Sequence, residues 1–286
     1  MKRFKLLYRA AGLLLSAVMI AGGFAGCSTT PSEEGTLTPP PSSAVVTGGK
    51  NEGINTLGPL DKPEILFKDD EKYGAMTDIE LSRYVGAEGM VLLENSKQTL
   101  PLSKDDTVAL FGSAQIDFVK GGTGCGDVNA LYIVNALEGI RQKVKDGKVK
   151  LYEALSKKYE SDINYRPSKD DIAAAAKSAN KAIVFISRNS GENVDVAPAK
   201  YYLTATEKAL LENVCNGGFK GVTVILNIGT VMDTSFVKDY PEIDSVLVSW
   251  QAGMEGGNAL ADVLVGDVNP SGKLAETYPL SENDVP

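Results

Sequence analysis

Histidine is absent from this chain of 286 residues, and it contains only three cysteines and one tryptophan. Without histidine, Ser-His-Asp and Cys-His nucleophilic sites are excluded, together with most zinc and haem sites. Because Cys27, Cys125 and Cys215 form no CxxC pair, the sequence predicts neither a zinc knuckle nor a redox centre. We expect no metal and no organic cofactor. A disulfide between Cys125 and Cys215 stays an open question.

Basic residues are also fewer than acidic residues. Lys and Arg together number 29 against 37 Asp and Glu, which gives a formal net charge of −8. Nucleic-acid binding needs clustered basic side chains, so this balance argues against a nucleic-acid partner. The hydrophobic content of 43% and the charged content of 23% are ordinary for a soluble globular protein and permit a substantial core.

Residues 1–26 have the three-part pattern of a secretory signal: a basic start, an apolar run and small residues before Cys27. The apolar run is too short to be well suited to crossing a bilayer. Residues 24–27 resemble a bacterial lipobox, with Phe24 in place of the usual Leu, so we expect Cys27 to carry a lipid. The protein would then be exported and anchored to the outer face of a bacterial membrane. The alternative is an ordinary signal peptide with an incidental cysteine.

Residues 27–65 are rich in Ser, Thr, Gly and Pro and show no sustained hydrophobic period. Such a composition is typical of a flexible tether. We expect the folded domain to occupy residues 66–280 and residues 281–286 to begin a linker to a further region.

Short apolar runs then alternate with segments of helical spacing. We expect strands at residues 107–112, 182–186, 222–226 and 245–250, and helices at 79–93, 130–144, 172–180, 204–214 and 258–265. Thr204 and Glu207 have the spacing of a capping box, and Gly266 is the expected stop of the last helix. This alternation predicts an α/β fold with a mostly parallel sheet covered on both faces. Ligands of such folds lie beyond the carboxyl ends of the strands, so the loops there are the candidate sites.

The loop after the first of these strands, residues 120–129, is rich in glycine. Glycine lets a backbone approach a ligand closely, so Gly122, Thr123, Gly124 and Asp127 are candidate ligand-binding residues. A nucleotide site is a weak alternative, because the glycines do not match the GxGxxG pattern and no GKS or GKT sequence follows them. A tight turn without a ligand is the other alternative.

The loop after the second strand, residues 187–195, carries two carboxylates three residues apart, Glu192 and Asp195, with Arg188 and Ser190 nearby. In a chain without histidine, a carboxylic acid is the best available general acid. Glu192 is therefore a candidate proton donor. The alternative is that Glu192 is simply a solvated loop residue.

Trp250 ends the fourth strand beside a glycine-rich loop, just before a helix. This position suits stacking on the face of a sugar, and a core aromatic residue is at least as good an interpretation. Glu255, directly before the helix, is explained by a favourable interaction with the helix dipole.

Several segments, taken together and in order, resemble the α/β sandwich domain of glycoside hydrolase family 3. They are residues 87–95 with Leu100-Pro101-Leu102, GGTG at 121–124, SRNSGE at 187–192, WQAGMEGG at 250–257, and GDVNPSGKL at 266–274 followed by Thr277-Tyr278-Pro279. The last segment combines a helix end, a turn through Asn-Pro-Ser-Gly and an expected strand start, and is rarely met outside this family. The resemblance runs from about residue 77 to residue 279 and implies a three-layer (α/β)6-type sandwich.

The resemblance implies a retaining hydrolase of β-glucosides or related β-glycosides, which uses two carboxylates and an oxocarbenium-like transition state. In this family the nucleophile is an aspartate on a separate (β/α)8 barrel, and the sandwich domain typically supplies the acid/base, here Glu192. Asn193 replaces a usual glycine in this loop, and Val196 replaces a usual arginine. The residues expected to contact a β-linked oligosaccharide or glucoside are Gly122, Thr123, Gly124, Asp127, Arg188, Ser190, Asp195 and Trp250.

No part of this sequence has the eight-fold βα pattern of that barrel. We therefore expect the barrel to come from a further region or a separate chain, and this sequence to be the front of a longer hydrolase. The alternative is a non-catalytic, membrane-tethered lipoprotein that binds carbohydrate through the 121–129 loop and Trp250. The replacement of the usual arginine by Val196 favours that alternative, because a binding module does not need an arginine to adjust the properties of a proton donor.

Overall fold

The computed structural model describes residues 76–192 and 198–284. The expected signal peptide, the tether and Cys27 lie outside these ranges, and so does Asp195. Within them, no helix is both long enough and apolar enough to cross a membrane.

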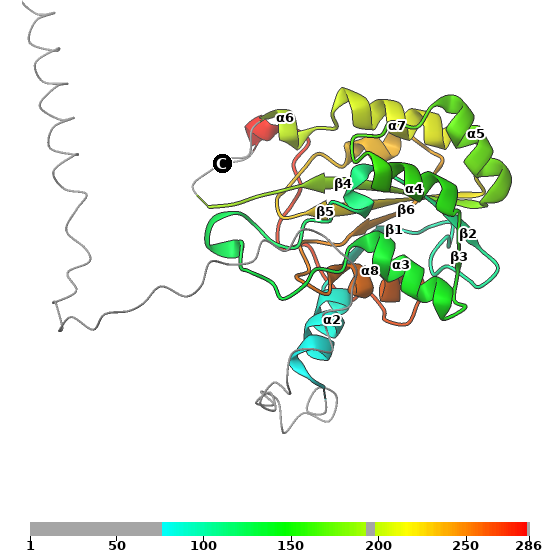
Figure 1. Cartoon of the computed structure of the whole chain (residues 1–286). Coiled ribbons are helices and arrows are strands. Elements are labelled where there is room, and N and C mark those ends of the chain that lie inside the picture. Colours follow the sequence, from blue (N-terminus) through cyan, green and yellow to red (C-terminus); the bar gives the residue numbers. More distant parts are fainter. Residues whose placement is uncertain (1–75, 193–197, 285–286) are drawn as a thin grey trace, which may run out of the picture. The chain divides into compact units, whose positions relative to one another are not determined.

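A six-stranded sheet forms the centre of the domain, with the strand order β1-β6-β5-β4-β2-β3 (Figure 1). The sheet is mostly parallel, as expected, because only β1 runs antiparallel, where it pairs with β6. All four predicted strands are present. The strands are β1 (Val91–Glu94), β2 (Thr107–Phe111), β3 (Lys150–Leu151), β4 (Lys181–Arg188), β5 (Gly221–Ile228) and β6 (Ile243–Val248).

Helices cover both faces of this sheet, which confirms the three-layer sandwich (Figure 1). Side chains of α4, α5 and α7 join one apolar core, and side chains of α2, α3 and α8 join the other. The short helix α6 follows β4. The helices are α2 (Asp78–Glu88), α3 (Ala136–Lys145), α4 (Glu153–Ser161), α5 (Lys169–Ser178), α6 (Pro198–Tyr201), α7 (Ala205–Cys215) and α8 (Gly256–Leu264).

Strand β4 shows why the predicted strands are continuous apolar runs. Ala182, Val184 and Ile186 belong to the core under α4, α5 and α7, whereas Ile183 and Phe185 belong to the opposite core. A strand buried on both faces needs apolar side chains at every position rather than at alternate positions.

The order of the strands reverses between β2 and β4. From β2 the chain passes outward to β3 at the edge, returns past β2 to β4, and continues through β5 to β6. In open α/β sheets a crevice opens beyond the carboxyl ends of the strands at such a reversal. The fold therefore places a crevice beside the loops that follow β2 and β4.

The predicted helix over residues 79–93 is wrong in its last five residues. Helix α2 ends at Glu88, Gly89 is its C-cap, and the chain then forms β1. Val91 of β1 pairs with Val248 of β6. Backbone pairing with the edge of the sheet outweighs the helical spacing of the apolar residues, since strand formation depends on the partner strand.

The predicted helix over residues 130–144 begins later than expected. Helix α3 starts at Ala136, and residues 130–134 before it are not helical. Asn135 is the N-cap, and its side chain and that of Glu138 form a capping box. Because this box satisfies backbone N–H groups at the start of the helix, it sets the boundary.

The expected capping box of α7 is confirmed. The Glu207 N–H donates to Thr204 Oγ1 at 3.2 Å, and the Glu207 carboxylate accepts from the Thr204 N–H at 2.8 Å. Helix α8 ends before Gly266, whose φ of 77° suits the predicted stop.

The strand expected to begin near Lys273 does not form among the described residues 273–280. The turn before it packs on the turn between α2 and β1 instead, where the Gly272 N–H donates to the Met90 carbonyl at 3.0 Å.

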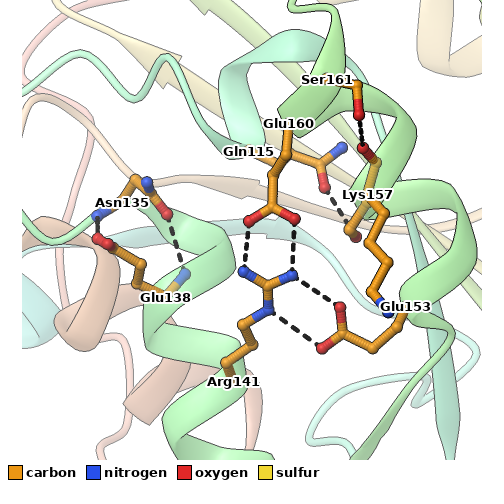
Figure 2. A network of polar contacts seen from close by, with 9 residues as sticks. Gln115, Asn135, Glu138, Arg141, Glu153, Lys157, Glu160 and Ser161 are labelled. Carbon is orange, nitrogen blue, oxygen red and sulfur yellow. Dashed lines mark hydrogen bonds and ion pairs between the residues drawn. The ribbon is translucent and has the colours of Figure 1, made fainter. Parts of the chain in front are cut away.

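Ion pairs join α3 of one helical layer to α4 of the other, and Figure 2 shows Arg141 between Glu153 and Glu160. Arg141 of α3 contacts Glu153 of α4 at 2.7 Å and Glu160 of α4 at 2.6 Å. The hydrogen bonds to Glu160 and Glu153 raise the pKa of Arg141, although burial opposes them. Partly exposed ion pairs contribute little free energy each, so the main effect is to orient α3 relative to α4.

Candidate active-site loops

A buried asparagine connects two of the three candidate loops. Asn227, near the end of β5, has no exposed surface. Its Oδ1 accepts from the Val119 N–H at 2.7 Å, and its Nδ2 donates to the carbonyls of Val119 at 3.0 Å and Trp250 at 2.6 Å. The loops after β2 and β6 are thereby fixed to β5. Our sequence analysis missed Asn227, although a polar residue directly after the apolar run at 222–226 was a signal.

The glycine-rich loop packs directly on the acidic loop. The Thr123 N–H donates to the Ser190 carbonyl at 2.8 Å, and Thr123 and Gly191 form a parallel β-bridge. This contact has no room for a side chain, because a Cβ on Gly191 would lie 1.4 Å from Thr123 Oγ1. Gly124, with a φ of 71°, lies against Glu192, where an added Cβ would be 3.0 Å from Oε2. The structure therefore brings these predicted site residues together.

Glu192 is exposed at this contact. Its Oε2 accepts a hydrogen bond of 3.3 Å from the Cys125 N–H. A carboxylate held by one long hydrogen bond at the carboxyl edge of the sheet is accessible to a ligand and can exchange a proton. Asp195, Asn193 and Val196 lie in residues 193–197, outside the described ranges.

The remaining predicted polar residues also lie at this edge. Asp127 Oδ1 contacts Lys120 Nζ at 2.8 Å, and 68% of the Asp127 side chain stays exposed. Ser190 Oγ donates to the Gly229 carbonyl at 2.9 Å. Gly122 lies against Ser190, because a Cβ there would be 3.0 Å from the Ser190 carbonyl oxygen. Sugar contacts by Gly122, Asp127 and Ser190 stay predictions.

Arg188 departs from its expected role. It is 6% exposed, and its N–H groups donate to the carbonyls of Ser187, Lys200 and Tyr202 and to both carboxylate oxygens of Glu207. A guanidinium has five N–H donors, so every one is used inside the protein. Arg188 therefore has no donor left for a sugar and instead fixes the end of β4 to α6 and α7. Burial opposes ionisation of Glu207, but the Arg188 guanidinium keeps the pKa of Glu207 below its usual range.

The contacts of Trp250 favour the core interpretation over sugar stacking. Its Nε1 donates to the Gly89 carbonyl at 2.9 Å, and its ring packs, partly buried, against the apolar core. Its φ of 55° is uncommon for a residue other than glycine. The indole thus holds the loop after β6 against the turn between α2 and β1.

Glu255 occupies the N-cap position of α8 and is 4% exposed. Its carboxylate accepts from the Tyr132 hydroxyl at 2.6 Å and from Asn258 Nδ2 at 2.8 Å. Burial, together with the hydrogen bond to Glu255, raises the pKa of Tyr132. Glu255 therefore has a structural role, as expected, and Tyr132 is a partner that our sequence analysis missed.

The two cysteines of the described part are free thiols, which answers the question of a disulfide. Cys125 is exposed in the glycine-rich loop, and Cys215 is buried. Burial raises the pKa of Cys215 to about 12. In the ranges that the structure covers, no group of three or more Cys, Asp or Glu residues could hold a metal ion.

These features define a doubly wound α/β domain with a glycine-rich loop and an acidic loop packed together at the carboxyl edge of its sheet. Residues 90–286 match the family model described as the glycosyl hydrolase family 3 C-terminal domain. The chain therefore belongs to glycoside hydrolase family 3, as the resemblance of its motifs implied.

Its relatives are longer proteins. Beta-glucosidase A of Butyrivibrio fibrisolvens is 38% identical over 246 residues, and a beta-glucosidase of Ruminococcus albus is 34% identical over 229 residues. Each alignment covers 73% of this chain, but only 29% and 24% of the relatives. The structure of beta-glucosidase 3B from Thermotoga neapolitana in complex with alpha-D-glucose gives a TM-score of 0.67 at 37% identity, covering 75% of this chain and 33% of that chain. The chain thus spans a third or less of the length of these proteins.

Proposed function

We propose that this chain is the sandwich part of a retaining glycoside hydrolase that acts on β-glucosides, with Glu192 as its general acid/base. The observation that carries the proposal is the packing of the glycine-rich loop on the Glu192 loop, which leaves an accessible carboxylate at the carboxyl edge of the sheet. Family membership and the beta-glucosidase names of its relatives support the reaction class.

The residues of the site suit the two proton transfers of this reaction. The acid/base first protonates the leaving glycosidic oxygen and then takes a proton from the attacking water. The hydrogen bond from the Cys125 N–H orients Glu192 without burying it, so the carboxyl group can change protonation state during turnover. The bridge between Thr123 and Gly191 holds the two loops in register.

The nucleophile in this proposal is an aspartate on a (β/α)8 barrel that lies outside this domain. An exposed apolar surface beside the glycine-rich loop supports such a partner. Val128 and Leu131 are each 66% exposed, and Ile133 is 46% exposed. The Val134 N–H donates to the Met254 carbonyl at 2.8 Å and anchors this segment. Apolar side chains gathered on a surface beside a candidate site are typical of a protein interface.

Export and lipid attachment at Cys27 belong to the same proposal. The basic start, the short apolar run and the lipobox-like residues 24–27 support them. Mass spectrometry of the protein from membranes should find a diacylglyceryl group on an N-terminal Cys27. An unmodified chain that retains residues 1–26 would contradict the proposal.

Glu192→Gln tests the catalytic role in a form of the protein that contains both the sandwich and the nucleophile domain. We expect kcat for 4-nitrophenyl β-glucoside to fall by roughly 10²–10⁴-fold, the range of general acid/base catalysis. Glu212→Gln, at an exposed position of α7, is the matched control and should keep full activity. Turnover by Glu192→Gln close to that of the control would contradict the role of Glu192.

A non-catalytic carbohydrate-binding lipoprotein is the second candidate function, favoured by Val196 in place of the usual arginine. The hydrogen bond from Trp250 to Gly89 removes one argument for it, since the indole is engaged within the domain. This candidate predicts β-glucan binding without hydrolysis in every form of the protein. Hydrolysis that depends on Glu192 would exclude it.

A further inference from the structure

A cavity of about 490 Å³ opens beyond the carboxyl ends of β2 and β4. It is lined by residues 112–114 after β2, by Phe185 and Ser187 of β4, by residues 163–167, and by side chains of α4 and α7. It therefore lies where the order of the strands reverses, the usual place for a ligand in this kind of fold. Its volume is within the range of about 300–1,000 Å³ typical of small-molecule sites. Apart from Ser187, the first residue of the 187–195 loop, none of its lining residues belongs to the two candidate active-site loops.

Aromatic side chains form part of the cavity wall. The rings of Tyr159 and Tyr165 meet edge to face with their centroids 5.4 Å apart. The Tyr165 hydroxyl donates to Asp171 Oδ2 at 2.5 Å, so the ring is held in place although it is only partly buried. Leu210 adds further apolar surface. A fixed aromatic ring in the wall of a cavity suits the apolar face of a pyranose.

Unused hydrogen-bonding groups surround these rings. Among the described lining residues, the side chains of Asn164 and Asn213 have no hydrogen-bond partner. Arg166 donates from Nη1 to Thr206 Oγ1 at 3.1 Å, which leaves most of its five donors free. Planar amide and guanidinium groups can each bond two neighbouring hydroxyls of a sugar.

The buried end of the cavity offers a further donor. The Tyr159 hydroxyl accepts from the Gly112 N–H at 2.9 Å, and burial raises the pKa of Tyr159 to about 12. The hydroxyl therefore keeps its proton at every working pH and can donate it to a ligand oxygen.

A phosphate or another anion suits this cavity poorly. At the start of α7, Thr204 Oγ1 accepts the Glu207 N–H, and the Glu207 carboxylate adds negative charge there. Arg188 neutralises that carboxylate. This leaves Arg166 as the cation among the described lining residues that could attract an anion, and its side chain is exposed to solvent. A purely apolar ligand is disfavoured as well, because it would leave the polar lining groups without partners.

We propose that this cavity is a second carbohydrate-binding site, which holds one pyranose unit of a β-linked oligosaccharide. Tyr165 packs against the sugar ring, and Arg166 and Asn213 bond its hydroxyls. The choice of β-glucosides as ligands rests on the proposed function. The site lies at the same edge of the sheet as the candidate active site, so it keeps a chain of sugars close to Glu192.

Calorimetric titration of the purified chain with cellobiose tests this proposal. We expect a Kd of roughly 1–10 mM and a weakening of about fivefold or more in Asn213→Ala and in Arg166→Ala. Asn213→Ala is the most informative variant, because its side chain makes no hydrogen bond within the described protein and its loss leaves the fold intact. Tyr165→Ala should abolish binding. Asn269→Ala, at an exposed position that does not line the cavity, is the control and should bind cellobiose as the wild type does.

Three outcomes would overturn the proposal. One is no binding of cellobiose at roughly 50 mM, well above the expected Kd. Another is binding that Glu192→Gln weakens while Asn213→Ala does not, which would place the sugar at the active-site loops. The third is full competition by inorganic phosphate, which would indicate an anion site. Glu192 and the cavity residues are changed separately, so failure of this proposal is distinguishable from failure of the proposed hydrolysis.

Discussion

The side chain of Asn227 determines how firmly the candidate loops are held, because it makes three hydrogen bonds in a fully buried position. Asn227→Ala removes all three and leaves backbone groups of Val119 and Trp250 without these partners. At about 0.5–1.5 kcal/mol for each hydrogen bond, the loss amounts to about 1.5–4.5 kcal/mol. Since Val119 and Trp250 are only partly buried, water can replace some of the bonds. We therefore expect unfolding free energy to fall by about 2–3 kcal/mol.

Urea unfolding of the purified chain, followed by circular dichroism, measures this loss. The midpoint should move to lower urea while the m-value stays constant, because the same surface is exposed on unfolding. Asn269→Ala is the matched control: this exposed side chain makes only contacts of 3.4 and 3.5 Å, and its removal should cost less than about 0.5 kcal/mol. A loss below about 1 kcal/mol for Asn227→Ala would refute the role that we give to this side chain.

Two further substitutions test the packing around the site. Gly191→Ala places a Cβ 1.4 Å from a threonine hydroxyl and should lower Tm by several degrees. Gly126→Ala is the control and should leave Tm unchanged, because no atom lies within 4 Å of the new Cβ. Equal Tm values for the two variants would contradict the packing of the two loops. Arg188→Met removes the guanidinium that lowers the pKa of Glu207. Because the pKa of Glu207 is lower in the folded state than in the unfolded state, the ion pair stabilises the fold at pH values above the unfolded pKa of about 4.3. This stabilisation is lost as the pH falls through the pKa of Glu207 in the folded state. The difference in unfolding free energy between wild type and Arg188→Met should therefore narrow from about pH 7 to about pH 3, and a constant difference would contradict the coupling.

The central strands of the fold could be predicted from the sequence because their burial leaves a direct pattern. In β4, alternate residues enter two different cores, so the whole strand is apolar. The capping box at Thr204 is equally local, since both of its partners lie within one turn of helix.

Elements that depend on distant partners could not be predicted in this way. Val91 and Leu92 continue an apolar segment of helical spacing, and only the presence of β6 makes them a strand. The two-residue strand β3 is too short to produce a hydrophobic pattern. The start of α3 differs for another reason: the helical spacing of apolar residues continues before Asn135, although the local capping box of Asn135 and Glu138 marks the first turn of the helix.

The candidate site was predicted at the level of loops and only partly at the level of side chains. Topology alone puts the loops after β2 and β4 at one edge, and the structure packs Thr123 against Gly191 there. The direction of a side chain depends on partners that the local sequence does not reveal. Arg188 pairs with Glu207, and Trp250 bonds to Gly89, which is 161 residues away in the chain.

The central claim, that Glu192 is the acid/base of a retaining hydrolase, is tested most directly by azide rescue of Glu192→Ala in a form that contains both domains. With 2,4-dinitrophenyl β-glucoside the leaving group needs no proton, so the glucosyl-enzyme still forms. It then accumulates, because no base activates water, while azide attacks without deprotonation. We predict that azide accelerates turnover and yields β-glucosyl azide, identified by NMR. No acceleration, or an azide product of α configuration, would contradict the claim.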